Sequence, residues 1–147
     1  MPDLFSASPK PAPKADAPGT QKTIKIATWN VNSLKARMPN VLAWLKEFSP
    51  DVVLFQEIKC TDDSFPYLEL EDAGYNIASH GQKTYNGVAI LSKLPLEDVT
   101  RGLPGDDADE QARYIEATVV GTQAVRIAGL YLPNGNPAPG QIGRAHV

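Results

Sequence analysis

The pattern of apolar and polar positions predicts two strands joined by a helix near the start of the folded part. Residues 24–29 form a short apolar run, and residues 52–56 form a continuous one, which is typical of a strand covered on both faces. Between them, residues 38–48 carry apolar side chains at helical spacing, with Pro39 in the expected first turn and Pro50 after the end. A strand, a helix and a second strand in this order predict a βαβ unit with parallel strands.

The chain that follows predicts one short helix and two pairs of strands. The helix is expected at about residues 64–73, with Gly74 as its stop. The strands are expected at 75–79, 87–92, 113–120 and 124–132, the last two joined across Gly121-Thr122. An early βαβ unit followed by hairpins predicts an α/β sandwich with a mixed sheet.

Composition sets the limits of the folded part and its environment. Residues 1–22 are rich in proline and have few large apolar side chains, so we expect a disordered Pro/Ala/Lys tail. This tail contains acidic residues and no arginine, unlike an organellar transit peptide. The single cysteine, Cys60, excludes an internal disulfide, and the cytoplasm is the expected location. No apolar run approaches the roughly 20 residues of a membrane helix.

The net charge limits how the protein could bind phosphates. With a formal charge of −3, the chain has no global positive field to attract nucleic acid. A local basic patch or a bound cation would have to do so. Lys35, Arg37 and Lys59 flank the two predicted strand ends and could form such a patch, although each is equally compatible with an ordinary surface position.

Both strands of the predicted βαβ unit end in polar side chains. Asn30 closes the first strand, and Gln56 and Glu57 close the second. In open α/β sheets, ligands bind beyond the carboxyl ends of the strands, so these side chains are expected at one edge. The Glu57 carboxylate suits Mg²⁺, which keeps several waters for a substrate phosphate, and Asn30 could orient it. A solvated loop glutamate is the alternative from the residues alone.

Four further polar positions are candidates, and three of them are open to two interpretations. Tyr131 ends the last predicted strand and is either a donor to a phosphate oxygen or a half-buried rim aromatic. Arg113 follows the acidic run GDDADEQ and either holds a phosphate or pairs with those acids. Asn134 begins a turn signal, and His80 lies in a polar connection as a base or as a solvated histidine.

Five sequence blocks together carry a resemblance to a known family. They are ATWNVNSLKAR, PDVVLFQEIK, GYNIASHGQKTYNGVAILSK, RGLPGDDADEQAR and GLYLPNGNP, in this order. The chain resembles the exodeoxyribonuclease III family, the bacterial apurinic/apyrimidinic endonucleases of base-excision repair, within the endonuclease/exonuclease/phosphatase superfamily. The first two blocks mark the superfamily, and the HGQK and PGDD blocks narrow the resemblance to this family. It covers about residues 24–137.

This resemblance implies a fold and an activity. The expected fold class is α/β, the N-terminal half of a four-layer sandwich with two mixed β-sheets, in residues 23–140. The expected cofactor is Mg²⁺, with Mn²⁺ as a substitute. The expected substrate is duplex DNA, cleaved 5′ to an abasic site or trimmed 3′ to 5′ from its ends, by a monomeric enzyme. Two rival functions are a superfamily phosphatase acting on a lipid or inositol phosphate and a non-catalytic DNA-binding module.

The resemblance also assigns roles to residues that match the family motifs. Glu57 matches the metal ligand, and Asn30 matches the asparagine that supports the metal. Tyr131 matches the tyrosine near the scissile phosphate. Arg113 and Asn134 fall where relatives have polar groups that face the DNA.

The C-terminal part of the chain departs from the family pattern. Relatives carry a D-x-N block soon after the tyrosine motif and an Asp-His pair further on, and nothing after Tyr131 matches either. We therefore expect this polypeptide to be inactive. Residues 141–147 are expected to be non-native, because one frame of a common sequencing-library adaptor encodes IGRAHV. Genomic reads running through these codons would contradict that expectation.

Overall fold

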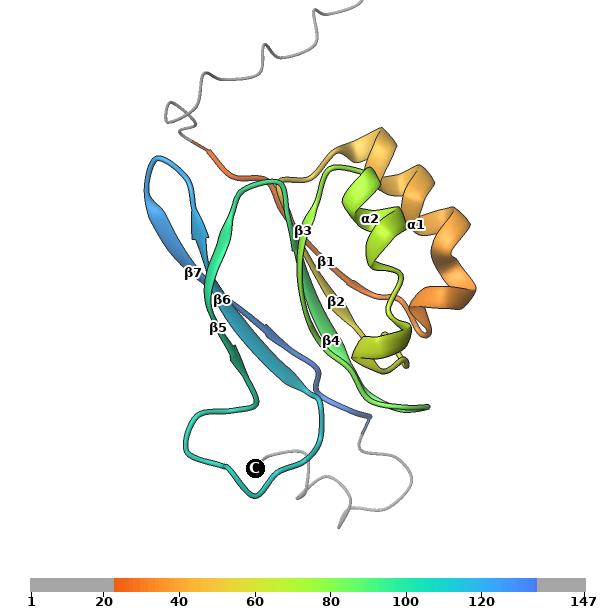
Figure 1. Ribbon diagram of the computed structural model, residues 1–147, viewed down its shortest axis with the longest axis vertical. Helices are drawn as coiled ribbons and strands as arrows, with labels where there is room; N and C mark the ends of the chain where they lie inside the picture. Colours follow the sequence, from red (N-terminus) through yellow and green to blue (C-terminus); the bar gives the residue numbers. More distant parts are fainter. Residues whose placement is uncertain (1–22, 135–147) are drawn as a thin grey trace, which may run out of the picture.

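A computed structural model describes residues 23–134 of the chain. The predicted tail at 1–22 and the predicted non-native end at 141–147 lie outside the described residues. The elements are β1 (Ile26–Asn30), α1 (Leu34–Phe48), β2 (Val52–Gln56), a 3₁₀ turn (Asp62–Ser64), α2 (Tyr67–Asp72), β3 (Asn76–His80), β4 (Val88–Ser92), β5 (Leu96–Arg101), β6 (Tyr114–Val120) and β7 (Ala124–Leu130) (Figure 1). No helix in this range is long and apolar enough to span a membrane.

The first sheet, sheet A, has the strand order β1-β2-β4-β3. Strands β1 and β2 are parallel, with Ile26 opposite Val52 and Asn30 opposite Gln56, which confirms the predicted βαβ unit. Strand β4 is antiparallel to both β2 and β3. The sheet is therefore mixed, and the carboxyl ends of β1, β2 and β3 lie at the same edge.

The second sheet, sheet B, has the order β5-β6-β7. The predicted α/β fold with two sheets is confirmed, but the described strands of sheet B are antiparallel throughout, because each strand reverses to pair with the next. Strand β5 was not predicted from the sequence. Its register shifts between Glu97 and Thr100, and Asp98 has a left-handed φ of 51°, so its side chains do not alternate regularly.

The elements stack as three layers, with α1 and α2 on one face of sheet A and sheet B on the other (Figure 1). The helix-side core gathers around three buried side chains, Leu34, Leu45 and Phe55. The core between the sheets gathers around Ile90 and Ile115. Because β2 and β4 contribute to both cores, they read as almost uninterrupted apolar runs.

Helix α1 starts four residues earlier than the pattern predicted, so Pro39 lies inside it and not in its first turn. The cause is tertiary: the Leu34 side chain is fully buried, and its N–H donates to Ile58 O at 3.1 Å. This contact begins the helix directly after the end of β1. The helix stops at Ser49, which is left-handed and donates its N–H to Leu45 O, and Pro50 follows.

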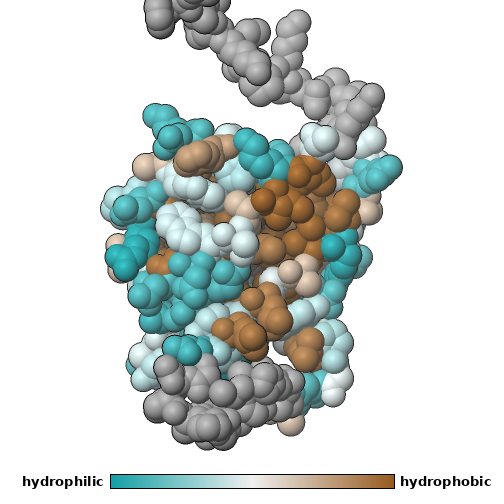
Figure 2. Space-filling model, turned by 180° about the vertical axis from the view of Figure 1, so that it is seen from behind, coloured by the Kyte–Doolittle hydropathy of each residue, from teal (hydrophilic) through white to brown (hydrophobic). Residues whose placement is uncertain are grey.

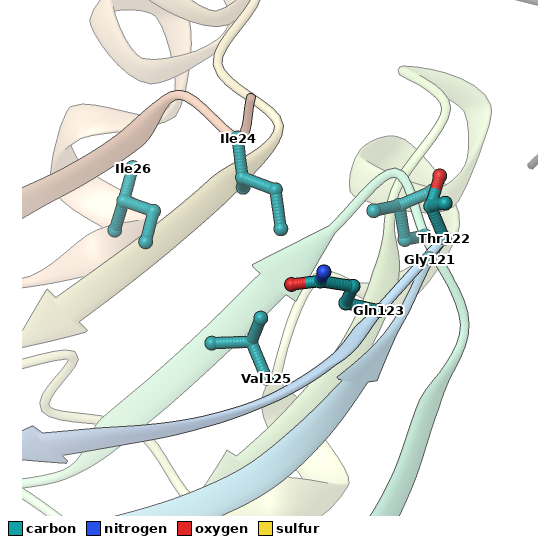
Figure 3. A pocket seen from close by; sticks show the side chains of 7 residues that line it. Ile24, Ile26, Gly121, Thr122, Gln123 and Val125 are labelled. Carbon is teal, nitrogen blue, oxygen red and sulfur yellow. The ribbon is translucent and has the colours of Figure 1, made fainter. Parts of the chain in front are cut away.

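One side of the sandwich is open along β1 and β7, the edge strands of the two sheets. Ile26 on β1 is 47% exposed and Leu130 on β7 is 58% exposed. Seen from behind, apolar side chains gather in a patch that faces solvent (Figure 2). A mainly apolar pocket of about 400 Å³ lies between Ile24 and Ile26 at the start of β1 and the β6–β7 hairpin with Val125 (Figure 3). Because Asn30 ends β1, this pocket lies at the opposite end of the strand from the polar edge.

Candidate active site

The backbone holds the ends of β1 and β2 in register beyond the strands themselves. Val31 N–H donates to Gln56 O at 3.0 Å, and Ser33 N–H donates to Glu57 O at 2.8 Å. On the other side, Ile58 N–H donates to Gly87 O at 3.1 Å, which ties this segment to β4. The polar side chains at the edge are therefore carried on a fixed backbone.

Four residues at this edge have left-handed backbone conformations that L-amino acids rarely adopt. They are Asn32 (φ 43°), Ser33 (φ 81°), Glu57 (φ 52°) and Lys59 (φ 53°). Such conformations cost free energy and persist where the surrounding structure enforces them, often at functional sites. Here they let the backbone turn sharply after both β1 and β2.

Asn30 and Glu57, the two predicted metal-site residues, are in direct contact. Asn30 Nδ2 donates to Glu57 Oε1 at 2.8 Å. The amide orientation is fixed by its other end, because Asn30 Oδ1 accepts from Asn32 N–H at 3.1 Å. Since Asn30 presents a donor to the carboxylate, the ionised form of Glu57 is favoured.

Lys59 adds a positive charge to this pair. Its Nζ lies 3.4 Å from Glu57 Oε2 and donates to Asn32 Oδ1 at 2.6 Å. The hydrogen bond from Asn30, together with the contact with Lys59, lowers the pKa of Glu57 below its ordinary value, against a smaller opposing effect of burial. Glu57 is therefore an anion at neutral pH and available to a cation.

The side chains of Tyr131 and Glu57 interact. Burial, and then the Glu57 charge, raise the pKa of the Tyr131 phenol, which keeps it a protonated donor at neutral pH. Its backbone N–H donates to Arg113 O at 2.8 Å. Strands β6 and β7 thus bring Tyr131 and Arg113 to the edge already occupied by Asn30 and Glu57.

A carboxamide network positions Arg113. Arg113 Nε donates to Asn86 Oδ1 at 3.4 Å, and Asn86 Nδ2 donates to Gln111 Oε1 at 2.8 Å. Gln82 Oε1 accepts from Asn86 Nδ2 at 3.1 Å and from Ala112 N–H at 2.9 Å. No sequence pattern singles out these three carboxamides, although two of them lie in the HGQK-TYNG block.

The remaining candidates have less defined places. Asn134 is exposed and follows Tyr131 beyond the end of β7, and its DNA-facing role stays a prediction. His80 ends β3, where burial lowers its pKa. Sequence reasoning noted Lys59 only as a flanking charge and assigned no role to Asn32. Asn32 lies two residues after Asn30 and Lys59 two residues after Glu57, and this spacing was the available signal.

The donors at the edge are oxygen atoms, which suit a hard divalent cation. Glu57 Oε2 and Asn32 Oδ1 both contact the same ammonium, so both point to one position. Within residues 23–134, no group of three or more His, Cys, Asp or Glu side chains could hold a metal. A cation here would keep most of its water, as Mg²⁺ usually does at phosphate sites.

A two-sheet α/β sandwich with a carboxylate–carboxamide pair at its carboxyl edge agrees with the class that the sequence resembles. A model of the endonuclease/exonuclease/phosphatase family matches residues 27–144. The chain belongs to this family. The resemblance read from the sequence blocks is therefore confirmed.

Individual relatives are nucleases, one of them named for DNA repair. The chain is 42% identical over 94 residues to exodeoxyribonuclease III of Haemophilus influenzae, covering 64% of this chain and 35% of that protein. It is 31% identical over 121 residues to the DNA repair nuclease APEX1 of Danio rerio, covering 79% of this chain and 38% of that protein.

Solved structures show the same fold. The 3′ phosphatase NExo from Neisseria, bound to a product DNA hairpin, superposes with a TM-score of 0.77 at 42% identity over 84% of this chain and 48% of that one. An AP endonuclease from Archaeoglobus fulgidus gives a TM-score of 0.70 at 38% identity over 76% of this chain and 42% of that one. The chain spans less than half the length of these relatives.

Proposed function

We propose that this chain carries the cation-holding and phosphate-orienting wall of a Mg²⁺-dependent DNA-repair nuclease of the exodeoxyribonuclease III type. The observation that carries the proposal is the Asn30–Glu57 hydrogen bond at 2.8 Å, which joins the ends of two parallel strands beside Tyr131. The relatives' names, exodeoxyribonuclease III and AP endonuclease, support duplex DNA with abasic sites or 3′ ends as the substrate.

The residues have distinct tasks in this proposal. A divalent cation bound at Glu57 would offset phosphate charge and stabilise the developing oxyanions. Asn30 keeps the Glu57 carboxylate ionised and oriented. Tyr131 stays protonated and donates to a phosphate oxygen, and Arg113, held by Asn86, binds the phosphate electrostatically. None of these groups is an acid–base pair suited to activating water.

The first test measures cleavage by the full 147-residue chain with Mg²⁺ on abasic duplex DNA. We expect no cleavage above background, because Glu57, Asn30, Tyr131 and Arg113 include no acid–base pair suited to activating water. Cleavage that Glu57→Gln abolishes would contradict the proposed inactivity while supporting the nuclease function. Hydrolysis of phosphoinositide micelles under the same conditions would favour the phosphatase alternative.

The second test measures phosphate binding by Arg113 independently of catalysis. Arg113→Ala should weaken binding of a 3′-phosphate DNA hairpin and reduce the slope of log affinity against log salt by about one. Arg126→Ala is the matched control, because Arg126 pairs with Glu116 on sheet B at 2.8 Å. Fluorescence anisotropy across a salt series gives both quantities. Equal losses in the two variants would count against a specific phosphate site at Arg113.

A further inference from the structure

The Lys59 ammonium lies between two oxygen atoms that come from different strand ends. Asn32 Oδ1 is 2.6 Å from Nζ, and Glu57 Oε2 is 3.4 Å from it. The Lys59 side chain is 29% exposed and that of Glu57 is 22% exposed, so the ammonium lies at the rim and not in the core. The structure thus already holds one positive charge at the carboxyl edge.

We call the position between Asn32 Oδ1 and Glu57 Oε2 the cation seat, because it has the properties of a cation-binding site. Both atoms are hard oxygen donors, one of them anionic. Asn30 contacts both residues, donating to Glu57 Oε1 and accepting from the Asn32 backbone N–H. The backbones of Asn32, Glu57 and Lys59 are all held in left-handed conformations. The fold thus tolerates strained backbone conformations that hold a carboxylate, a carboxamide and an ammonium close together.

We propose that Lys59 occupies the seat of the divalent cation, and that Lys59 must swing out of it before the cation can bind. This inference rests on the proposed function, since it places the cation at Glu57. Lys59 can leave because its side chain is partly exposed, and its charge is then free to meet a substrate phosphate. The ammonium therefore neutralises Glu57 when the cation is absent and weakens the affinity of the site for the cation.

The test is a Mn²⁺ titration of the full chain, followed by the electron paramagnetic resonance signal of free Mn²⁺. Lys59→Met should bind Mn²⁺ about tenfold more tightly than the unsubstituted chain, because no ammonium then competes with the ion for Glu57 Oε2 and Asn32 Oδ1. Lys59→Arg keeps the charge and should bind as weakly as the unsubstituted chain. Lys46→Met is the control for net charge, since Lys46 is exposed in the last turn of α1, far from the site.

Each outcome decides between the claims. Tighter Mn²⁺ binding by Lys59→Met alone supports the seat. Binding by Lys59→Met that is equal to or weaker than that of the unsubstituted chain overturns it, as does an equal gain in Lys46→Met. Unchanged binding in Glu57→Gln would overturn the metal assignment itself, and the seat with it. Lys59→Gln, with circular dichroism of every variant, repeats the test if the methionine variant misfolds.

Discussion

The two faces of strand β1 have opposite environments, although they belong to the same five residues. On one face, Trp29 packs against Trp44 of α1, and Ala27 is half-buried. On the other, Ile26, Thr28 and Asn30 are exposed, because sheet B ends at β7 and β7 packs over β2 and β4. The covered face stabilises the fold, and the open face carries both the apolar pocket and the candidate site.

The covered face is built from interlocking aromatic rings. Trp29 meets Trp44 edge-on with ring centroids 5.2 Å apart, and it meets Phe55 at 6.2 Å. Such contacts add to the free energy of burial. The open face holds Thr28 to Gln56 by a hydrogen bond of 2.8 Å, and Asn30 to Glu57 likewise. The same strand thus separates the stabilising residues from the chemical ones.

The largest expected effect is on the covered face. Phe55→Ala should lower the free energy of unfolding by about 3–5 kcal/mol, because Phe55 is 1% exposed and its loss leaves a cavity. Ile26→Ala, on the open face, should cost less than about 1 kcal/mol, because Ile26 is already 47% exposed. Urea unfolding of both variants measures the difference. Similar losses would show that the open face is covered in solution.

The next largest effect is a loss of folding stability at alkaline pH, and it also arises on the covered face. Burial, and then the Asp51 charge, raise the pKa of Tyr75 to about 12 from 10.0. The neutral phenol donates to Pro50 O at 2.7 Å. Its stabilisation is complete below pH 10 and is lost as pH rises toward 12, about 2–3 kcal/mol in all.

The measurement is the pH dependence of unfolding in the Tyr75→Phe variant. The variant should start less stable at neutral pH, since Pro50 O loses its donor, and then lose about 2–3 kcal/mol less than the unsubstituted chain between pH 10 and 12. Tyr85→Phe is the control, because Tyr85 is 67% exposed. Parallel profiles for Tyr75→Phe and the unsubstituted chain would refute the assignment.

A smaller effect is expected on the open face, at the site. Asn30→Ala should raise the pKa of Glu57 toward its ordinary value of 4.5, because the largest cause of the lowering is removed. A lowered carboxyl pKa contributes stability that is present above pH 4.5 and is lost as pH falls through the lowered value. The variant should therefore lose about 1 kcal/mol at neutral pH and less in acid.

Carboxyl-carbon NMR titration of Glu57 follows this change directly. Thr28→Ala is the matched control, because Thr28 lies on the same face of β1 and bonds to Gln56 and not to Glu57. A Glu57 pKa that moves equally in both variants would mean that the strand end, and not the Asn30 amide, sets it.

Apolar periodicity was enough to predict the parallel βαβ unit, because β2 is buried on both faces and α1 has a clear apolar stripe. The start of α1 was mispredicted because the Leu34 contacts with Ile58 are tertiary. Strand β5 was missed because its bulge and the left-handed Asp98 interrupt the alternation. The local apolar pattern thus predicted strand β2, which is buried on both faces. It missed the start of α1, which depends on a tertiary contact, and strand β5, whose backbone is irregular.

The residues of the candidate site also divide into those that the sequence pattern predicted and those whose roles depend on the folded backbone. Asn30 and Glu57 were predictable because parallel strands bring their carboxyl ends together, and their hydrogen bond confirms that they are neighbours. The role of Lys59 was not predictable, since it depends on left-handed turns that no residue type there demands. The interaction of Tyr131 with Glu57 needed sheet B to pack on sheet A, which the spacing of residues alone does not encode.

The smallest expected effect on stability is that of Ile26→Lys. This variant tests whether the open face promotes self-association. An exposed apolar edge strand is a template for association between chains, and a lysine on it opposes that association. The free energy of unfolding should change by no more than about 0.5 kcal/mol. Self-association, followed by sedimentation velocity over a concentration series, should fall. Leu68→Lys is the control, because Leu68 is 75% exposed on α2, on the covered side. If both lysines reduce association equally, the aggregation hazard belongs to exposed leucine and isoleucine in general and not to the open face of β1 and β7.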